Sequence, residues 1–155
     1  MFKSKGFTLI EILIVIGIIA IIATMVIIAI NPARQFAAAR NTKRTSDAIA
    51  ILNAVHQRMV DNKGLFAEGS VCDSLPTSGA KYITSVNGVS NVDLCDCLVP
   101  TYLAAMPYDP SATGTSFTDC TNYTSGYTVS WNQTTSRMTV AAPSAELGET
   151  ISVTR

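Results

Sequence analysis

The chain opens with an almost unbroken apolar run. Between residues 7 and 30 the only side chains that are neither apolar nor Gly belong to Thr8, Glu11 and Thr24. At about 1.5 Å rise per residue a helix over this run reaches roughly 36 Å, enough to cross a hydrocarbon core of about 30 Å. The pattern therefore predicts a membrane-spanning helix over residues 7–30. A secretory signal peptide is the alternative, but its apolar region usually covers only about 7 to 15 residues.

An amphipathic helix is predicted to follow over residues 31–63. Strong helix formers resume after Pro32, and neither Gly nor Pro recurs until Gly64. One face carries apolar residues at spacings of three and four, with Ile49 and Ile51 flanking it: Ala48, Leu52, Val55 and Met59. Pro32 lacks a backbone donor and crowds the preceding turn, so we expect a kink or loosened turn there. Residues 7 to about 62 would otherwise form one helix of roughly 80 Å.

The composition changes after Gly64 to Ser, Thr, Gly, Asn and Pro, which is typical of turns and short strands. Strand candidates combine β-branched and aromatic residues with partial alternation: residues 81–86, 126–132, 137–142 and 150–154. A small sheet has one face to bury, and the amphipathic helix is the available partner. We therefore predict an α+β fold. A long N-terminal helix, half transmembrane and half amphipathic, would pack on a small antiparallel β head formed by residues 64–155.

Charge is distributed unevenly although the net charge is zero. Residues 31–63 carry six Lys or Arg against two Asp, whereas residues 64–155 carry three against eight acidic residues. A nucleic-acid-binding head normally shows a basic face. The acidic head therefore argues against nucleic acid as a partner, including for a DNA-binding competence filament.

The four cysteines all lie beyond the apolar run: Cys72, Cys95, Cys97 and Cys120. An even number in a small, loop-rich head outside the cytoplasm favours two disulfides. A bond between Cys95 and Cys97 would be strained, so each pairs with either Cys72 or Cys120, which leaves two connectivities open. Zinc fits less well, because its ligands usually come as C-x₂₋₄-C pairs. The positive-inside rule opposes a head outside the cytoplasm. Four basic residues lie between residues 34 and 44, and the rule would place them on the cytoplasmic side.

Glu11 is the one carboxylate within the apolar run. A charged residue costs about 2.5–3.5 kcal/mol at mid-membrane and less near an end, so it usually has a partner and a function. The alternative is that Glu11 lies near the interface and reaches the headgroups. Gly17, Ala20 and Thr24 form a stripe of small side chains on one face, where helices could approach closely.

The residues KGFTLIE at positions 5–11, followed by an apolar helix, resemble the cleavage and methylation signature of the type IV pilin and pseudopilin family. The resemblance covers residues 3 to about 30 and extends along the helix to Asn62. It implies that a prepilin peptidase removes residues 1–6 as a leader, by cutting between Gly6 and Phe7, and that the new amino group is methylated. A Gly at this place lets a peptidase approach the backbone.

Cleavage would remove Lys3 and Lys5 and leave a cationic amine on Phe7, one helical turn from Glu11. The resemblance implies that Glu11 pairs with the amine of a neighbouring subunit. The carboxylate would then select the stagger of the helices, because a buried charge penalises registers that leave it unpaired. The resemblance also implies partial unwinding in the filament, for which Pro32 is the natural place. The family usually has its helix-breaking proline nearer the middle of the run.

We therefore expect a structural pilin subunit rather than an enzyme. It would start as a single-pass membrane protein in contact with lipid and then polymerise into a type IV pilus-like surface filament, or fimbrium. Its partners would be further copies of itself in a helical homopolymer, the prepilin peptidase and the inner-membrane assembly machinery. A pseudopilin of type II protein secretion shares every one of these features. An alternative from another functional class is a membrane-anchored extracytoplasmic binding or receptor domain, which would use the N-terminal helix only as an anchor.

No cofactor is expected. The sequence contains no nucleophile elbow and no phosphate-binding glycine loop. Four acidic residues could contribute oxygens to a calcium site, although a solvated acidic surface is the simpler interpretation: Asp109, Asp119, Glu146 and Glu149. The segment DPSATG at residues 109–114 also resembles the major pseudopilins of type II secretion, which carry calcium there.

Overall fold

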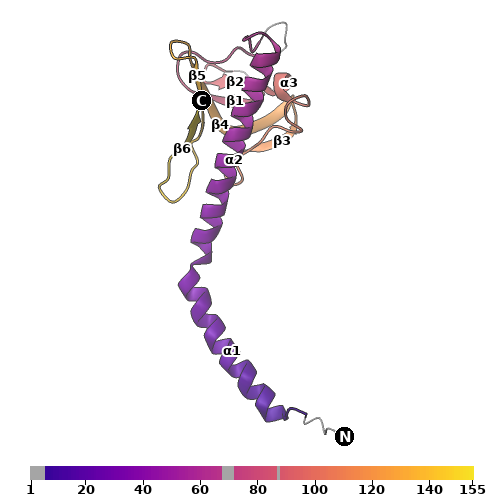
Figure 1. Cartoon of the computed structure of the whole chain (residues 1–155), viewed down its shortest axis with the longest axis vertical. Helices are drawn as coiled ribbons and strands as arrows, with labels where there is room; N and C mark the ends of the chain where they lie inside the picture. Colours follow the sequence, from indigo (N-terminus) through magenta and orange to yellow (C-terminus); the bar gives the residue numbers. More distant parts are fainter. Residues whose placement is uncertain (1–5, 68–71, 87) are drawn as a thin grey trace. The chain divides into compact units, whose positions relative to one another are not determined.

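The computed structural model divides the chain into two compact units. They are Met1–Phe36 and Ala37–Arg155. The residues that the structure describes are 6–67, 72–86 and 88–155. The first unit contains an apolar helix, and the second contains most of a further helix together with a sheet (Figure 1).

Helix α1 spans Leu9–Ile30 and belongs to the first unit. None of its 22 residues is buried. It is long and apolar enough to cross a membrane by length and composition. Apolar side chains on such a surface are stable only against lipid or other helices, because water disfavours their exposure.

The single long helix predicted from the sequence is interrupted at Asn31. This residue has φ 48° and ψ 78°, in the left-handed region, and it separates α1 from α2, which spans Pro32–Asp61. A residue before proline is disfavoured in right-handed helical angles, and Asn tolerates the left-handed region. The Arg34 N–H donates to the carbonyl of Asn31 at 3.1 Å and to its Oδ1 at 3.3 Å. The expected loosened turn is therefore a one-residue break, with Pro32 at the first helical position, which it favours.

The second unit is built on a six-stranded sheet with strand order β2-β1-β4-β5-β6, and β3 pairs with β4 (Figure 1). The strands are β1 (Lys81–Thr84), β2 (Asn91–Val92), β3 (Ser116–Asp119), β4 (Asn122–Asn132), β5 (Arg137–Ala142) and β6 (Ile151–Thr154). A short helix, α3, spans Cys95–Leu98. All four segments predicted as strands form strands, with shifts at some of their ends.

The prediction of a purely antiparallel sheet is wrong at one edge. Strands β1 and β2 are parallel, with Tyr82 opposite Asn91 and Ile83 opposite Val92. The other strand pairs among the described residues are antiparallel. Strand β2 has two residues, too few for an alternating pattern to show in the sequence. The sheet is therefore mixed.

One face of α2 and the sheet enclose the core. The helix contributes four fully buried residues at positions i, i+3, i+4 and i+7: Ala48, Ile51, Leu52 and Val55. They form one cluster with buried side chains of the sheet, among them Ile83, Val129, Met138 and Val140. Of the other residues named from the helical periodicity, Met59 is partly buried and Ile49 is 37% exposed. The helix is thus packed on a sheet head, as the sequence predicted.

Two disulfides link the loops around α3. Cys72 is bonded to Cys97 and Cys95 to Cys120, and each pair is 25 residues apart in sequence. This connectivity is one of the two that the sequence left open. Because all four cysteines are bonded, no thiolate remains for the zinc site weighed as an alternative.

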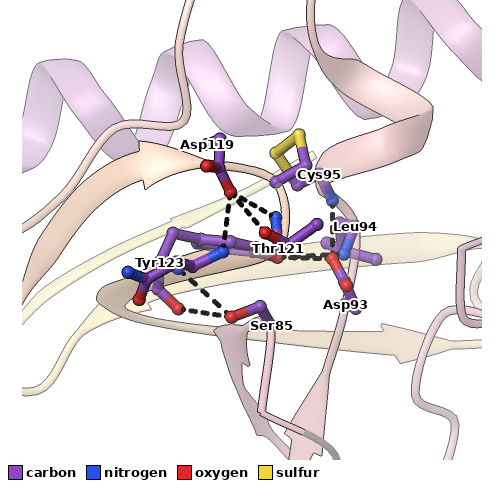
Figure 2. The surroundings of a disulfide bond; sticks show 9 residues. Ser85, Asp93, Leu94, Cys95, Asp119, Thr121 and Tyr123 are labelled. Carbon is purple, nitrogen blue, oxygen red and sulfur yellow. Dashed lines mark hydrogen bonds between the residues drawn. A yellow bond between two sulfur atoms is a disulfide. The ribbon is translucent and has the colours of Figure 1, made fainter.

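Hydrogen bonds hold the segment beside the Cys95–Cys120 bond (Figure 2). The buried Tyr123 hydroxyl donates to Asp93 Oδ1 at 2.7 Å and accepts the Leu94 N–H at 3.3 Å. The Cys95 N–H donates to the same Asp93 oxygen at 3.0 Å. Burial, and then the bond to Asp93, raise the pKa of Tyr123, so its hydroxyl stays a donor.

Candidate assembly site

The predicted processing site lies just before α1. Gly6 and Phe7 are outside any helix or strand, and both are exposed. Of the predicted leader only Gly6 lies among the described residues, whereas Lys3 and Lys5 lie outside them. Exposed backbone without regular structure is the kind of segment that proteases cut.

Glu11 lies in the first turn of α1 and forms a capping box with Thr8. The Glu11 N–H donates to the Thr8 hydroxyl at 3.3 Å, and the Glu11 carboxylate accepts the Thr8 N–H at 3.4 Å. Such reciprocal bonds satisfy N–H groups that a helix start leaves unpaired. Among the described residues no cation lies within ion-pair distance of Glu11. Sequence reasoning missed the role of Thr8, although the T-x-x-E spacing is the pattern that reveals a capping box.

The small residues of α1 lie on its exposed surface. A Cβ added to Gly17 would meet no atom within 4 Å. The Thr24 hydroxyl donates to the Ala20 carbonyl at 2.9 Å, within the helix. Since that hydroxyl has its partner, the stripe of Gly17, Ala20 and Thr24 presents no unpaired polar side chain to a neighbour. Its use as a packing surface remains a prediction.

The head contains a buried ion pair that the sequence did not predict. Arg44 of α2 donates from Nε to Asp109 Oδ2 at 2.7 Å and from Nη2 to Asp109 Oδ1 at 3.1 Å. Both side chains have no exposed surface. Two parallel charge-assisted bonds of this kind are among the strongest polar contacts in proteins. The pair fastens the loop between α3 and β3 to the helix.

The loop between β5 and β6, which carries Glu146 and Glu149, is bonded to Arg44 and its neighbours on α2. Together with the Arg44–Asp109 pair these contacts form one polar network. Glu146 accepts bonds from Arg44 Nη1 at 2.8 Å and from Arg40 at 2.6 and 2.7 Å. Asn41 accepts the Glu146 N–H at 2.9 Å and donates to its carbonyl at 2.8 Å. The Asn41 side chain also donates to Glu149 at 3.0 Å. The loop between β5 and β6 is therefore fixed to the part of α2 that carries Arg40, Asn41 and Arg44, where the Asp109 loop is also bound.

The network shifts the pKa values of its members. Hydrogen bonds from Arg40 and then Arg44 lower the pKa of Glu146 from 4.5 to about 2. Burial opposes ionisation of Asp109, but bonds from Arg44 and from two backbone N–H groups outweigh it and hold its pKa below the ordinary value. The bond to Asp109 raises the pKa of Arg44 despite its burial. Arg44, Asp109 and Glu146 therefore stay charged at neutral pH.

These contacts contradict the interpretation of a solvated surface for Asp109 and Glu146, whereas Asp119 and Glu149 are exposed as that interpretation requires. The contacts also do not fit a calcium site. Asp109 and Glu146 are neutralised by arginines. Asp119 instead accepts the hydroxyl and N–H of Thr121 at 2.7 and 2.8 Å. Calcium requires six to eight oxygen ligands converging on one point. Within the described part of the chain no three His, Cys, Asp or Glu side chains converge to hold a metal.

Comparison with known protein families gives a match to the N-terminal part of the chain. The family described as "Prokaryotic N-terminal methylation motif" matches residues 1–30. No curated protein and no solved structure gives a significant match. The matched segment contains Gly6, Phe7 and Glu11 as well as the whole of α1. The chain therefore carries the signature of type IV pilins and pseudopilins, a motif that marks structural pilin-type proteins.

Proposed function

We propose that this chain is a pilin subunit that polymerises, after leader removal between Gly6 and Phe7, into a type IV pilus-like surface filament. The observation that carries the proposal is that Glu11 is the one charged residue of helix α1, which has no buried residue in the single chain. Such a helix needs apolar surroundings: lipid before assembly and the helices of other copies afterwards.

Assembly would exchange the partners of Glu11. In the single chain its carboxylate is held by Thr8 through bonds of 3.4 and 3.5 Å, which are long for hydrogen bonds. Leader removal would create a cationic amine on Phe7. An amine from a neighbouring subunit would bring a full positive charge to the carboxylate, which the uncharged Thr8 groups cannot supply. Registers that leave either charge unpaired in the apolar core are disfavoured, so the pair would set the axial stagger.

The remaining parts have simpler roles in this proposal. The stripe of Gly17, Ala20 and Thr24 would let neighbouring helices approach closely. The break at Asn31 and Pro32 would allow α1 to pack among the helices of other subunits while α2 stays packed on its own head. The head, stapled by two disulfides, would form the filament surface. Partners during assembly would be the prepilin peptidase and the inner-membrane machinery.

A pseudopilin of type II secretion is the second candidate, because it shares the N-terminal motif. The Arg44–Asp109 pair favours the pilus, because a guanidinium neutralises the carboxylate of the segment in which major pseudopilins carry calcium. Unfolding of the full chain with and without a calcium chelator separates the two. We expect no shift in the midpoint, whereas a clear loss of stability would support a calcium-dependent pseudopilin head.

The test of the proposal is assembly in a host that supplies the peptidase and the pilus machinery. The wild-type chain should be recovered in sheared surface filaments with a mass that begins at methylated Phe7. The Glu11→Gln variant should be processed but absent from filaments. Glu149→Gln makes the same chemical change at an exposed acid of the head and should assemble normally.

A membrane-anchored binding domain makes the opposite prediction, since Glu11 would have no role beyond the anchor. A mature chain that starts at Met1, or Glu11→Gln filaments in normal number, would contradict the proposal.

A further inference from the structure

We infer that the head binds a neutral saccharide at a surface around Trp131, the only tryptophan of the chain. Trp131 lies near the end of β4 and is partly buried against the core. The inference rests on the head alone and does not depend on filament assembly.

Two shallow depressions meet at this residue. One has a volume of about 410 Å³ and the other of about 400 Å³. Both are lined by Thr77, Trp131 and Gln133, so these three residues lie between them. Each volume falls within the range of roughly 300–1,000 Å³ that is typical of ligand sites.

The described residues that line the two depressions differ in polarity, and none of them is charged. The first has an apolar wall that includes Met59, Leu65, Phe66 and Leu75. The second is lined mainly by hydroxyl and amide side chains, among them Ser130, Asn132 and Thr134. A pyranose ring offers an apolar C–H face and a rim of neutral hydroxyls, which matches an aromatic face flanked by neutral donors and acceptors. Among the described lining residues a charged ligand would find no counter-charge.

Polar groups at the centre of this surface are available to a ligand. Within the described residues the Trp131 indole N–H, the Gln133 amide and the Thr77 hydroxyl make no hydrogen bond to the protein. Thr77 and Gln133 are exposed. A saccharide hydroxyl can both donate and accept, so it can pair with each of these groups.

The walls are held in place without a ligand. The backbone N–H of Trp131 donates to the Pro76 carbonyl at 2.8 Å. This bond fixes the end of β4 beside the segment that carries Thr77. Arg58 donates to the Phe66 carbonyl at 2.8 Å and to the Cys97 carbonyl at 3.2 Å. A surface that is already ordered loses less entropy when it binds.

The test uses tryptophan fluorescence of the full-length chain, excited beyond the tyrosine absorption band, so that the signal comes from Trp131, the sole tryptophan. The chain is kept in lauryldimethylamine oxide, a detergent without a sugar headgroup. The probes are maltotriose, cellotriose and triacetylchitotriose, with trigalacturonate as the charged comparator. We expect a saturable change with at least one neutral trisaccharide and none with trigalacturonate. No saturable change with any neutral probe up to about 10 mM would overturn the inference.

Variants separate binding from general effects. Thr77→Ala and Gln133→Ala should each weaken binding roughly fivefold to tenfold, because each removes one hydrogen-bonding group. Thr118→Ala removes an exposed threonine from β3 and should leave binding unchanged. Equal weakening in all three variants would overturn the inference. A fluorescence change that follows protein concentration without sugar would also overturn it, and would assign the surface to contact with a second copy.

Discussion

Arg44 of α2 and Asp109 of the loop before β3 form a bidentate ion pair in which both side chains are completely buried. The two residues are 65 positions apart, so the pair closes a long segment of the head onto its helix. Asp109 also accepts the N–H groups of Ser111 and Ala112 at 2.9 and 2.8 Å. A loop without regular structure thereby obtains a defined conformation.

Replacing Arg44 with Met should destabilise the head by about 3–5 kcal/mol, because the buried Asp109 carboxylate would lose its cation. The double variant Arg44→Met with Asp109→Leu should recover part of this loss, since it buries no unpaired charge at that site. Urea unfolding of the full chain in detergent measures both. A single variant as stable as the wild type would show that the pair does not hold the loop.

Stability should fall in acid because of Glu146. Its pKa is about 2 in the folded chain against an ordinary value of 4.5. A carboxyl with a lowered pKa contributes stability that is fully present above the unfolded value and is lost as pH falls through the folded one. The free energy of unfolding should therefore decrease from about pH 4.5 toward pH 2. Urea titrations across this window check it, and Glu146→Gln should flatten the decrease; an unchanged slope would contradict the assignment.

Gly126 should tolerate no side chain. Its φ is +76°, and an added Cβ would lie 2.7 Å from the Thr115 methyl and 3.1 Å from Asp109 Cβ. Gly114 has φ +79° but open space around it, so Gly114→Ala is the matched control for backbone strain. Gly114→Ala should cost about 1–2 kcal/mol and Gly126→Ala clearly more. Equal losses in thermal or urea unfolding would show that the close approach of the loop does not matter.

Each disulfide should contribute a similar amount, because both close segments of 25 residues. Removing one pair, as Cys72→Ala with Cys97→Ala or as Cys95→Ala with Cys120→Ala, should lower the free energy of unfolding by roughly 3–4 kcal/mol. Denaturant unfolding under oxidising conditions measures the loss. Wild-type stability in either double variant would mean that the fold holds these loops without the bond.

Local signals in the sequence predicted the helices and most of the sheet. The apolar run up to Ile30 and the spacing of Ala48, Leu52 and Val55 each lie within one continuous segment, so periodicity suffices to reveal them. The left-handed Asn31 was not foreseen, although the effect of the following proline on that residue pointed toward it. The parallel β2 was missed because two residues carry no pattern.

Contacts between distant segments could not be predicted in the same way. Arg44 reads as one more solvated charge on α2, and only the folded loop brings Asp109 to it. The count of cysteines indicated two disulfides, but the choice between Cys97 and Cys95 for Cys72 depends on how α3 faces its neighbours. At the assembly site Glu11 was evident as a charge in an apolar run, and its bond to Thr8 was missed although the T-x-x-E spacing is the local signal for a capping box.

The most direct test of the filament proposal is solid-state NMR of filaments assembled from two populations of the chain. One population carries ¹⁵N-labelled Phe and the other ¹³C-labelled Glu, so a contact between the labels can arise only between subunits. The account predicts a dipolar contact between the Phe7 amine nitrogen and the Glu11 carboxyl carbon, with the amine within about 4 Å of a carboxylate oxygen. Filaments that form normally without this contact would contradict it.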